Sequence, residues 1–211
     1  MSVALSPLIH LIDDDAAVRD SLALLISTVG LRVQTWAQPE DFLRSFDRES
    51  IGAIVLDIRM PGISGMTVLE RLVEQGVDQP VIMLTGHGTV DLCRRAFKAG
   101  AAEFLEKPVD DELLLDTLQQ SVRRHVQCRQ RYRADRLAHE RYQQLSEREQ
   151  EVLGLIIAGL TNKEIGRALA VSHRTVETHR ANLFAKLQAE SLAQLIRQYA
   201  TLVEAGDSTT P

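Results

Sequence analysis

Short apolar runs alternate with segments of helical spacing along the first half of the chain. The apolar runs predict buried strands at residues 8–12, 31–36, 51–56, 81–84 and 103–105. The segments between and after them predict helices at residues 15–29, 39–46, 64–75, 89–99 and 110–122. Apolar strands separated by helices are typical of a parallel sheet covered on both faces. The first half is therefore predicted to be an α/β domain with a doubly wound five-stranded parallel sheet.

Polar residues and glycines at the element ends support this alternation. Asp15 precedes the first helix and Ser64 the third, where a side-chain oxygen can cap the free amides of a helix N-terminus. Gly30, Gly76 and Gly100 follow three of the predicted helices, and glycine readily ends a helix.

The pattern changes after the first domain. Residues 123–144 are strongly charged and contain no Gly or Pro, so they predict an exposed helical linker that continues the preceding helix. The chain is purely helical in pattern from Leu145 onwards. The predicted organisation is an α/β domain (1–122), a helical linker (123–144), a small all-α domain (145–204) and a flexible tail (205–211).

The all-α domain has the pattern of a helix-turn-helix. Ser146 and Glu149 form the signature of a capping box at its first helix. Thr161 begins a second helix, residues 171–172 make a tight turn, and a third helix covers residues 175–187. Two short helices joined by a tight turn, the second rich in Thr, His, Arg and Asn, are typical of a module that reads the major groove of DNA.

The side chains predicted to contact DNA fall into two groups. Those on the outer face of the third helix are expected to face base edges: Glu177, Thr178, Arg180, Ala181 and Asn182. Those expected to contact backbone phosphates are Asn162, Lys163, Thr175, His179 and Lys186. For each of these residues, a solvated surface position is the alternative.

Charge is divided unevenly along the chain. The 211 residues carry a net charge of −5. Residues 1–125 hold 12 basic and 19 acidic side chains (−7), and residues 126–211 hold 12 and 10 (+2). An acidic domain followed by a slightly basic one is compatible with DNA binding by the second.

Composition also indicates a compartment. Cys93 and Cys128 have no metal-ligand spacing around them, so we expect a reduced cytoplasm. No apolar run approaches the roughly 20 residues that cross a bilayer, and the N-terminus lacks a secretory pattern. Neither membrane association nor secretion is expected.

Polar side chains follow four of the predicted strands where each strand ends. Asp13 and Asp14 follow the first strand, Asp57 the third, Thr85 the fourth and Lys107 the fifth. The carboxyl ends of parallel strands meet at one sheet edge, so these side chains are expected to lie together. Three carboxylates suit Mg²⁺, and an Asp carboxylate can form an aspartyl-phosphate. We therefore predict that Asp57 accepts a phosphoryl group whose oxygens contact Lys107 and Thr85.

Each of these residues taken alone has a simpler role. A single Asp after a strand is more often a helix cap or turn residue, and a Lys-Pro pair such as Lys107-Pro108 is usually a loop. The joint occurrence of five suitable side chains at the ends of four strands favours a site.

Residues 8–122 resemble the receiver domain of two-component response regulators. The matching segments cover nearly the whole domain: LIDDD (11–15), VLDIRMPGISG (55–65), MLTGHG (83–88) and KAGAAEFLEKP (98–108). The resemblance implies that Asp57 is the phosphoacceptor. It also implies that Asp14 and Asp57 bind Mg²⁺ directly, that Asp13 binds it through water, and that the backbone carbonyl of Arg59 is a further ligand.

The same resemblance implies a conformational switch. Thr85 and Lys107 would sense the phosphoryl group, and Phe104 holds the position of an aromatic ring that moves inward with the threonine. A cis peptide bond is implied before Pro108. Val109 departs from the family, because close relatives usually have Phe there, on the face that forms the active dimer.

Residues 145–200 resemble the LuxR-type helix-turn-helix of the NarL/FixJ regulators. The matching segments are LSEREQEVL (145–153), AGLTNKEI (158–165) and TVETHRANLFAKL (175–187). In that family the last helix, here about residues 191–199, pairs the DNA-bound domains. Leu192, Leu195 and Ile196 would form that contact, or they belong to the intramolecular core.

The order of receiver, linker and helix-turn-helix resembles the FixJ-like transcription factors. The resemblance implies that a histidine kinase phosphorylates Asp57 and that the phosphorylated chains form a homodimer on promoter DNA, with RNA polymerase as a further partner. Apart from slow self-dephosphorylation, no enzymatic activity is expected.

Two other classes of protein are alternatives. A phosphatase that forms an aspartyl-phosphate also uses Asp and Mg²⁺, but typically has a second carboxylate two residues after the nucleophile, where this chain has Arg59. A protein-docking module would explain the helical domain without DNA. Salt-dependent retention on duplex DNA distinguishes that module from a DNA-binding domain.

Overall fold

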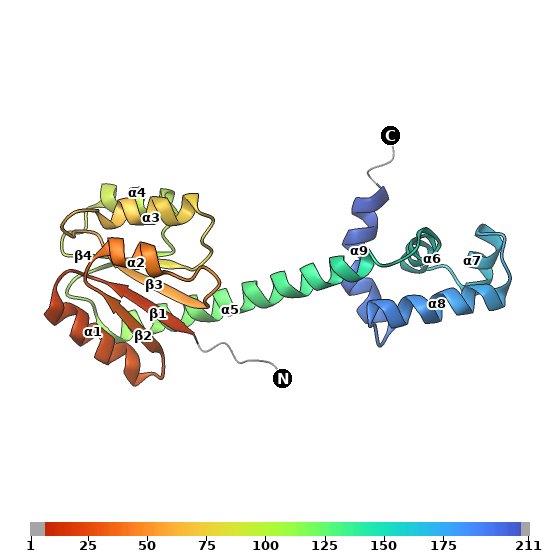
Figure 1. Ribbon diagram of the computed structural model, residues 1–211, viewed down its shortest axis with the longest axis horizontal. Coiled ribbons are helices and arrows are strands. Elements are labelled where there is room, and N and C mark those ends of the chain that lie inside the picture. The colour runs from red at the N-terminus through yellow and green to blue at the C-terminus, as the bar shows by residue number, and fades with distance from the viewer. Residues whose placement is uncertain (1–6, 208–211) are drawn as a thin grey trace. The chain divides into compact units, whose positions relative to one another are not determined.

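The first part of the protein is built on a parallel β-sheet (Figure 1). The computed structural model describes residues 7–207, and the chain divides into two compact units after Arg129. The strands of the first unit are β1 (Leu8–Ile12), β2 (Arg32–Trp36), β3 (Gly52–Asp57), β4 (Val81–Thr85) and β5 (Glu103–Glu106). Their order, β2-β1-β3-β4-β5 with every neighbouring pair parallel, confirms the doubly wound fold.

Strands β3, β4 and β5 extend one residue beyond their predicted ends. Asp57 pairs in register with Leu84, and Thr85 pairs with Glu106. The ladder includes these polar residues because backbone pairing continues after the apolar side chains stop. Asp57 is therefore the last residue of a central strand rather than a residue of the following loop.

Helices cover both faces of the sheet (Figure 1). Those of the first unit are α1 (Ala16–Thr28), α2 (Pro39–Ser45), α3 (Gly65–Glu74), α4 (Val90–Lys98) and the first part of α5 (Asp111–Tyr142). Helices α2, α3 and α4 lie on one face, and α1 and α5 on the other. Both faces of β3 are buried in this way, as its near-continuous apolar run requires.

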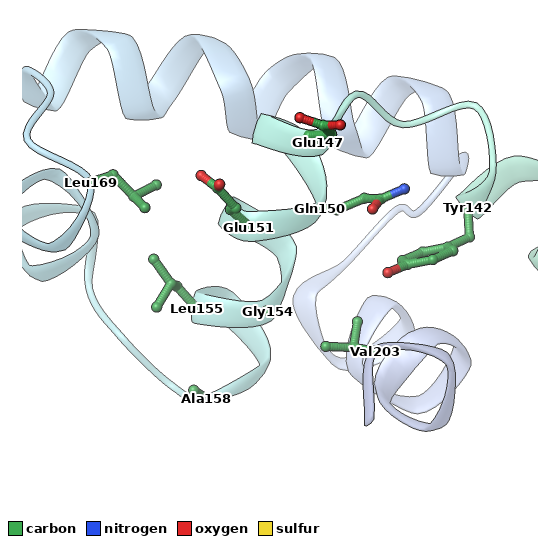
Figure 2. Close-up of a pocket in the computed structure, with 9 residues that line it drawn as sticks. All are labelled: Tyr142, Glu147, Gln150, Glu151, Gly154, Leu155, Ala158, Leu169 and Val203. Atoms are coloured by element: carbon green, nitrogen blue, oxygen red, sulfur yellow. The ribbon is translucent and has the colours of Figure 1, made fainter. Parts of the chain in front are cut away.

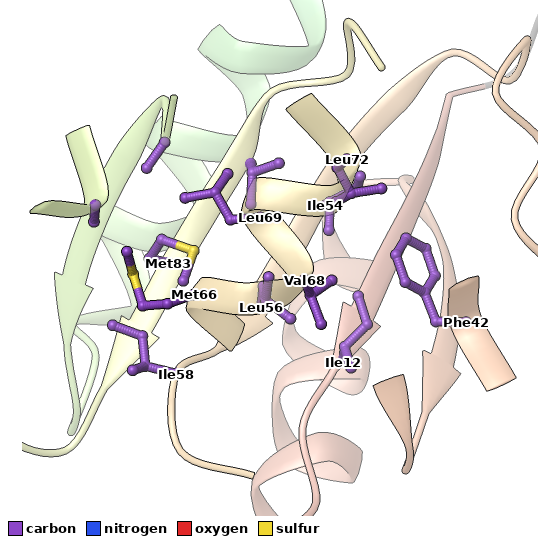
Figure 3. Packing of buried hydrophobic residues seen from close by; sticks show 13 residues of the cluster. Ile12, Phe42, Ile54, Leu56, Ile58, Met66, Val68, Leu69, Leu72 and Met83 are labelled. Carbon is purple, nitrogen blue, oxygen red and sulfur yellow. The ribbon is translucent and has the colours of Figure 1, made fainter. Parts of the chain in front are cut away.

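Two apolar clusters form the core of this unit. Ile54 and Leu56 of β3 pack with Leu69 of α3 and Phe42 of α2 on one face (Figure 3). The alternate residues of β3 pack against α1 and α5 on the other. Each fully buried Leu or Ile of these clusters stabilises the fold by about 1.5–3 kcal/mol.

The predicted helix caps are confirmed. The Asp15 carboxylate accepts hydrogen bonds from the backbone amides of Ala17 (2.8 Å) and Val18 (3.2 Å). The Ser64 hydroxyl accepts one from the amide of Thr67 (3.2 Å). These local contacts set where α1 and α3 begin.

The second unit consists of helices around a separate apolar cluster. After the end of α5 come α6 (Glu147–Ile157), α7 (Asn162–Ala168), α8 (His173–Leu187) and α9 (Leu192–Asp207). Val152, Ile165, Val176 and Leu183 are fully buried where α6, α7 and α8 meet. The capping box of Ser146 and Glu149 is present as predicted.

Two predicted boundaries in this unit are wrong. Helix α8 begins at His173 rather than near residue 175, because the Ser172 hydroxyl caps it by accepting from the Thr175 amide at 3.1 Å. Helix α9 continues to Asp207, so residues 205–207 are helical rather than part of a tail. The rest of the predicted tail, residues 208–211, lies outside the described residues.

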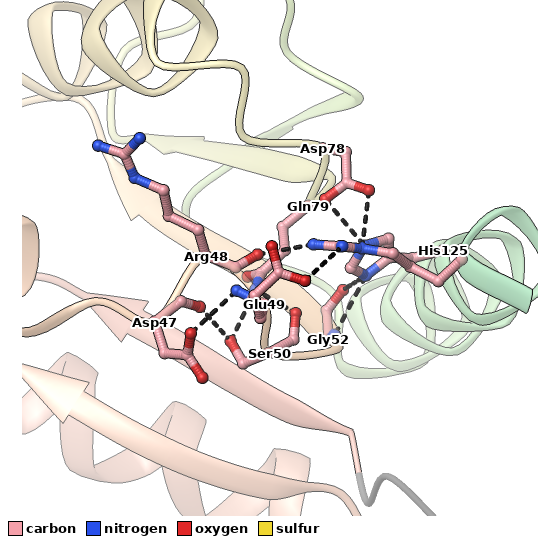
Figure 4. Close-up of polar contacts among 9 residues, drawn as sticks. Asp47, Arg48, Glu49, Ser50, Gly52, Asp78, Gln79 and His125 are labelled. Carbon is pink, nitrogen blue, oxygen red and sulfur yellow. Dashed lines mark hydrogen bonds and ion pairs between the residues drawn. The ribbon is translucent and has the colours of Figure 1, made fainter. Parts of the chain in front are cut away.

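Helix α5 confirms a helical linker that continues the preceding helix, because it runs unbroken from Asp111 to Tyr142. Its buried His125 lies against the start of β3 (Figure 4). Nδ1 of His125 is 3.0 Å from the carbonyl oxygen of Gly52, and Nε2 is 3.3 Å from the Asp78 carboxylate. Arg129 pairs with Asp78 at 2.8 Å and with Glu49 at 3.1 Å. The helix is thus held to the first unit as far as Arg129.

Candidate phosphorylation pocket and nucleic-acid interface

The carboxyl ends of the strands bring the predicted pocket residues together. Asp13 directly follows β1, Asp57 ends β3, Thr85 ends β4 and Lys107 directly follows β5. Asp13 and Thr85 are fully buried, and Asp57 is 4% exposed. Residues separated by up to 94 positions in the chain therefore share one polar pocket at the sheet edge.

Lys107 joins the two buried carboxylates of this pocket. Its Nζ donates hydrogen bonds to Asp13 Oδ2 at 2.6 Å and to Asp57 Oδ1 at 2.5 Å. The other oxygen of Asp57 accepts a hydrogen bond from the Arg59 amide at 2.7 Å. The carboxylate that is predicted to react is thus oriented by one ammonium group and one backbone amide.

Burial and charge together shift the pKa values in the pocket. Burial raises the pKa of Asp57 and the negative charge of Asp13 adds to this, while Lys107 opposes both, so the pKa lies above its ordinary value. Burial alone would lower the pKa of Lys107, but its bonds to Asp13 and Asp57 hold it above its ordinary value. The lysine is therefore a fixed positive charge beside the phosphoacceptor candidate.

The loop after Asp57 lies close to the start of α3. The Gly65 amide donates to the carbonyl oxygen of Ile58 at 3.0 Å. A Cβ atom at position 65 would lie 2.1 Å from the backbone oxygen of Asp57, which only glycine avoids. Gly65 therefore lets α3 begin directly beside the pocket.

Thr85 and Phe104, the predicted switch pair, lie on the neighbouring strands β4 and β5. The Thr85 hydroxyl accepts a hydrogen bond from the His87 amide at 3.2 Å. Phe104, on β5, is half-buried and lines a cavity of about 360 Å³ with Val90 and Cys93. The cis peptide bond expected between Lys107 and Pro108 is present.

Asp14, which follows Asp13, and Arg59, two residues after Asp57, are exposed. Among residues 7–207 no group of three or more His, Cys, Asp or Glu side chains is arranged to hold a metal ion, and Asp13 and Asp57 share the Lys107 ammonium. The donors available are carboxylate and carbonyl oxygens, the ligands that Mg²⁺ prefers. The donor set therefore fits this ion.

The pocket also includes a contact that the sequence pattern did not indicate. Arg19, on α1, donates a hydrogen bond to the backbone oxygen of Asp13 at 2.7 Å. It holds the turn in which the Asp15 amide donates to Asp13 Oδ1 at 3.0 Å. A basic residue one helical turn after the cap is the only signal, and it is too common to identify this role.

Helix α8 carries most of the residues predicted to contact DNA. Glu177, Thr178, Ala181 and Asn182 are exposed, as base-reading side chains would need to be. Arg180 is half-buried, and its guanidinium lies 5.9 Å from the ring centroid of Phe184. Stacking of this kind holds an Arg side chain extended along the helix surface.

The predicted phosphate contacts have different surroundings. Lys163 is exposed, whereas Thr175 and Asn162 are partly buried at the starts of α8 and α7. The Lys186 ammonium is bound to the buried Glu149 carboxylate at 2.7 Å. Burial alone would raise the pKa of Glu149, but bonds from Lys186 and Ser146 keep it below its ordinary value. The Lys186 ammonium therefore links α8 to α6 within the domain.

Basic residues beyond those predicted lie on the same part of the domain. Arg167, on α7, lines a cavity of about 170 Å³ with Asn162, Lys163 and His173. Arg174, in the first turn of α8, is exposed. The sequence predicted that this helix begins near residue 175. Arg174 was therefore not among the residues predicted to contact DNA.

The three residues predicted on the last helix have unequal exposure. Leu195 is fully buried in the core of its own domain. Of the two roles predicted for this side chain, dimer contact or intramolecular core, the structure therefore supports the second. Leu192 is 45% exposed, and Ile196 is partly buried. Leu192 is thus the residue of this set with the most surface available to a partner.

Another cavity of the second unit, about 700 Å³, lies on α6 (Figure 2). Glu147, Glu151 and Leu155 line one side of it, and Val203 and Tyr142 the other. None of the residues predicted to contact DNA lines this cavity. It therefore does not extend the candidate DNA-binding surface.

Comparison with known families assigns both units. Residues 9–119 match the response regulator receiver domain, and residues 143–199 match the bacterial regulatory proteins of the luxR family. A receiver followed by such a domain defines a response regulator, a phosphorylation-controlled transcriptional regulator that binds DNA. The receiver implies a histidine kinase as partner, and receiver domains bind Mg²⁺ at their phosphorylation site.

The chain belongs to the NarL/FixJ family of response regulators. It is 42% identical over 203 residues to the transcriptional regulatory protein FixJ of Azorhizobium caulinodans, covering 95% of this chain and 96% of that protein. The structure of the response regulator StyR is similar with a TM-score of 0.82 and 37% identity, covering 93% and 99% of the two chains. Full-length FixJ from B. japonicum matches with a TM-score of 0.58 and 38% identity over 93% and 97%.

Within residues 7–207, no helix is both long enough and apolar enough to span a membrane. The matched families account for the α/β unit and for the helices from α6 to the middle of α9.

Proposed function

We propose that Asp57 is the phosphoacceptor and that its phosphorylation promotes receiver dimerisation and promoter binding. The observation that carries this proposal is the convergence of two buried carboxylates, Asp13 and Asp57, on the ammonium of Lys107 at the strand ends. A buried charge cluster of this kind is costly to maintain and is commonly retained for function.

The transfer step follows from the chemistry of a carboxylate nucleophile. A carboxylate oxygen of Asp57 attacks the phosphorus of a phosphohistidine, an oxygen–phosphorus bond forms, and the nitrogen–phosphorus bond to the imidazole breaks. The bond electrons stay on the imidazole nitrogen, and because the other ring nitrogen of the phosphohistidine carries a proton, the leaving group is neutral histidine. Lys107 donates hydrogen bonds to the carboxylates before transfer and is placed to donate to a phosphoryl oxygen afterwards.

Asp13, Asp14, Asp57 and the backbone carbonyl of Arg59 would hold Mg²⁺ in this pocket. When bound, the ion would offset the negative charge of the phosphoryl group and of the carboxylates. The aspartyl-phosphate would then be lost slowly by hydrolysis, which resets the regulator.

Thr85 and Phe104 would carry the signal away from the pocket. The Thr85 hydroxyl accepts a hydrogen bond from the His87 amide and can donate its own proton to a phosphoryl oxygen. Phe104 is half-buried beside a cavity, so its ring has space to move when Thr85 does. The face formed by α4, β5 and α5 changes as a result, and two receivers pair through it.

Helix α8 would deliver the base contacts of each domain. Arg180 and Asn182 can make bidentate contacts with guanine and adenine edges, and Thr178 lies on the same exposed side. Lys163, Asn162, Thr175 and His179 would position the domain on phosphates, with Lys186 contributing when it is released from Glu149. Leu192 and Ile196 would pair the DNA-bound domains, and RNA polymerase would be the partner at the promoter.

Labelling of Asp57 tests the phosphoacceptor assignment. Incubation with radiolabelled acetyl phosphate and Mg²⁺ is expected to label the wild-type chain, and chelation of Mg²⁺ is expected to abolish the labelling. Asp57→Asn should take no label, because an amide cannot act as the nucleophile. Asp20→Asn, an exposed position on α1, is the matched control and should label normally. Labelling of Asp57→Asn at the wild-type level would overturn the assignment.

The coupling to DNA has its own test. Sedimentation velocity and promoter binding are measured before and after phosphorylation, and the wild type is expected to shift toward dimer and bind DNA more tightly. The Asp57→Asn variant should show neither change. A wild type that takes label without either change would disprove the coupling and leave the phosphoacceptor assignment intact.

A further inference from the structure

A cavity of about 490 Å³ opens beside the phosphorylation pocket. Asp14 lines it together with Glu40 from α2 and with Pro61 and Gly62 from the loop that follows Asp57. The cavity thus borders the predicted phosphoacceptor pocket at Asp14. A small molecule approaching the phosphoacceptor from this side would pass Glu40.

The position of Glu40 is constrained by its neighbours. It is half-buried and directly follows Pro39, which is buried at the start of α2. A Cβ atom at position 62 would lie 3.0 Å from Glu40 Oε1, so the carboxylate rests against the backbone of Gly62. Gly62 has a φ of 80°, a conformation that favours glycine and leaves this space. The Glu40 carboxylate is therefore placed on the wall of the cavity.

The Glu40 carboxylate is not held by a counter-charge on the described part of the chain, and Arg44, one turn further along α2, is paired with Asp41. No ion pair or hydrogen bond involves the Glu40 carboxylate there. Inside the pocket, the charges of Asp13, Asp14 and Asp57 would be neutralised together by Lys107 and one divalent cation. The charge of Glu40 would then face an incoming phosphodonor without compensation.

We infer that Glu40 determines donor specificity by disfavouring small anionic phosphodonors such as acyl phosphates. This inference rests on the proposed phosphorylation of Asp57. A small donor dianion gains only the contacts of its phosphoryl group, so repulsion by Glu40 directly lowers its rate of transfer. A phosphohistidine presented by a partner protein gains additional contacts over the protein surface, which offset the same repulsion. Glu40 therefore favours phosphorylation by a protein partner.

The test compares Glu40→Gln with wild type, using acetyl phosphate and Mg²⁺ at low ionic strength. The second-order rate constant of phosphorylation is expected to rise about fivefold. This is the effect of removing the Coulomb repulsion between one carboxylate and a dianion several ångströms away in a medium of high dielectric constant. The gain should shrink as salt is added, because salt screens the interaction. Glu74→Gln, an exposed position at the far end of α3, makes the same charge change and should leave the rate unaltered.

The outcomes separate the inference from the function on which it rests. An equal rate for wild type and Glu40→Gln, or an equal gain in Glu74→Gln, would overturn the role of Glu40. Glu40→Lys serves as a second variant and should exceed Glu40→Gln if charge is the cause. Failure of acetyl phosphate to label wild type and both Glu40 variants, with the fold intact by circular dichroism, would instead overturn the proposed phosphorylation.

Discussion

Lys107 serves two buried carboxylates at once, Asp13 at 2.6 Å and Asp57 at 2.5 Å. At the scale of the single residue, this shared ammonium is the main stabilising feature of the pocket. Without it, the two negative carboxylates would repel each other in a buried site where water does not screen their charges. His10 shows a different balance in the same unit. It is 3% exposed among Trp36, Phe42 and Phe46, and burial lowers its pKa to about 4.

Replacement of Lys107 by Met should destabilise the receiver when no divalent ion is present. The two buried carboxylates would lose their shared partner, and the free energy of unfolding in EDTA is expected to fall by about 3 kcal/mol. Mg²⁺ should restore part of this loss by taking the place of the ammonium. Urea unfolding with and without Mg²⁺ measures both effects, and Lys98→Met at an exposed position is the control. If Mg²⁺ stabilised neither protein, the pocket would not be its site.

Burial of His10 predicts a loss of stability in mild acid. The Nδ1 atom accepts a hydrogen bond from Trp36 Nε1 at 3.3 Å, and Nε2 is buried without a partner on the described part of the chain. With the folded pKa at about 4 and the ordinary value at 6.5, the unfolded chain binds the extra proton between these pH values. Stability should therefore fall as the pH drops through this window, by about 2 kcal/mol at pH 5 relative to pH 7.5.

The His10→Phe variant isolates this contribution. Urea unfolding of wild type and variant from pH 5 to pH 7.5 gives the difference in free energy at each pH. The difference should move in favour of the variant as the pH falls, since phenylalanine has no proton to bind. A difference that is constant with pH would show that His10 does not carry the effect.

At the scale of elements, α5 is the segment that belongs to both units. Its first part packs into the receiver core through Leu114 and Leu118, and its contacts with that unit end at Arg129. His125 binds the first residue of β3, while Asp57 is the last residue of the same strand. One strand thus has the phosphoacceptor candidate at its carboxyl end and the contact with the linker helix at its amino end.

Loss of the Arg129 contacts should loosen α5 locally. Arg129 pairs with Glu49 and Asp78 and donates to the backbone oxygen of Arg48 at 2.6 Å. In Arg129→Ala, amide hydrogen exchange over residues 122–129 is expected to become about fivefold faster, as for the loss of about 1 kcal/mol from partly exposed ion pairs. Arg133→Ala, an exposed position further along α5, should leave those amides unchanged. Unchanged exchange in Arg129→Ala would show that the contacts of Arg129 do not hold this part of the helix.

At the scale of the whole molecule, an acidic receiver precedes a slightly basic DNA-binding domain. Residues 1–125 carry a net charge of −7 and residues 126–211 a net charge of +2. The total of −5 therefore does not reveal that the second domain is positively charged. DNA binding by so small an excess must depend on where the basic residues lie. Arg167 and Arg174 are exposed on either side of the turn between α7 and α8. The exposed Lys163 lines the same cavity as Arg167 and His173, so positive charge gathers near the start of the reading helix.

Two substitutions should separate positioning from reading. Lys163→Ala is expected to weaken binding to every DNA sequence alike and to reduce the slope of log affinity against log salt by about 1. Asn182→Ala should leave that slope unchanged and lose about 1–3 kcal/mol of discrimination at one base position. Titration of specific and unrelated duplexes at several salt concentrations measures both. A salt slope altered by Asn182→Ala, or specificity altered by Lys163→Ala, would reverse the assigned roles.

Most of the architecture could be predicted because it is encoded locally. The apolar runs marked each strand to within one residue, and the caps of α1 and α3 at Asp15 and Ser64 were predictable from side-chain chemistry. Errors fell at two helix ends: the Ser172 hydroxyl that caps α8 was assigned to the turn, and α9 continues to Asp207 beyond the predicted end of the domain at residue 204. The hydrogen bond to the Ser172 hydroxyl sets where α8 begins, and continued backbone hydrogen bonding of the helix sets where α9 ends.

The sequence by itself determined the fold class, the two-domain order and the set of side chains at the strand ends, because parallel topology sends those ends to one edge. Only the tertiary structure decided how these side chains are used. It placed Lys107 between Asp13 and Asp57, bound Lys186 to Glu149, and buried Leu195 in its own domain. Such contacts join residues far apart in the chain, so no local pattern specifies them, and packing of the complete fold sets their distances.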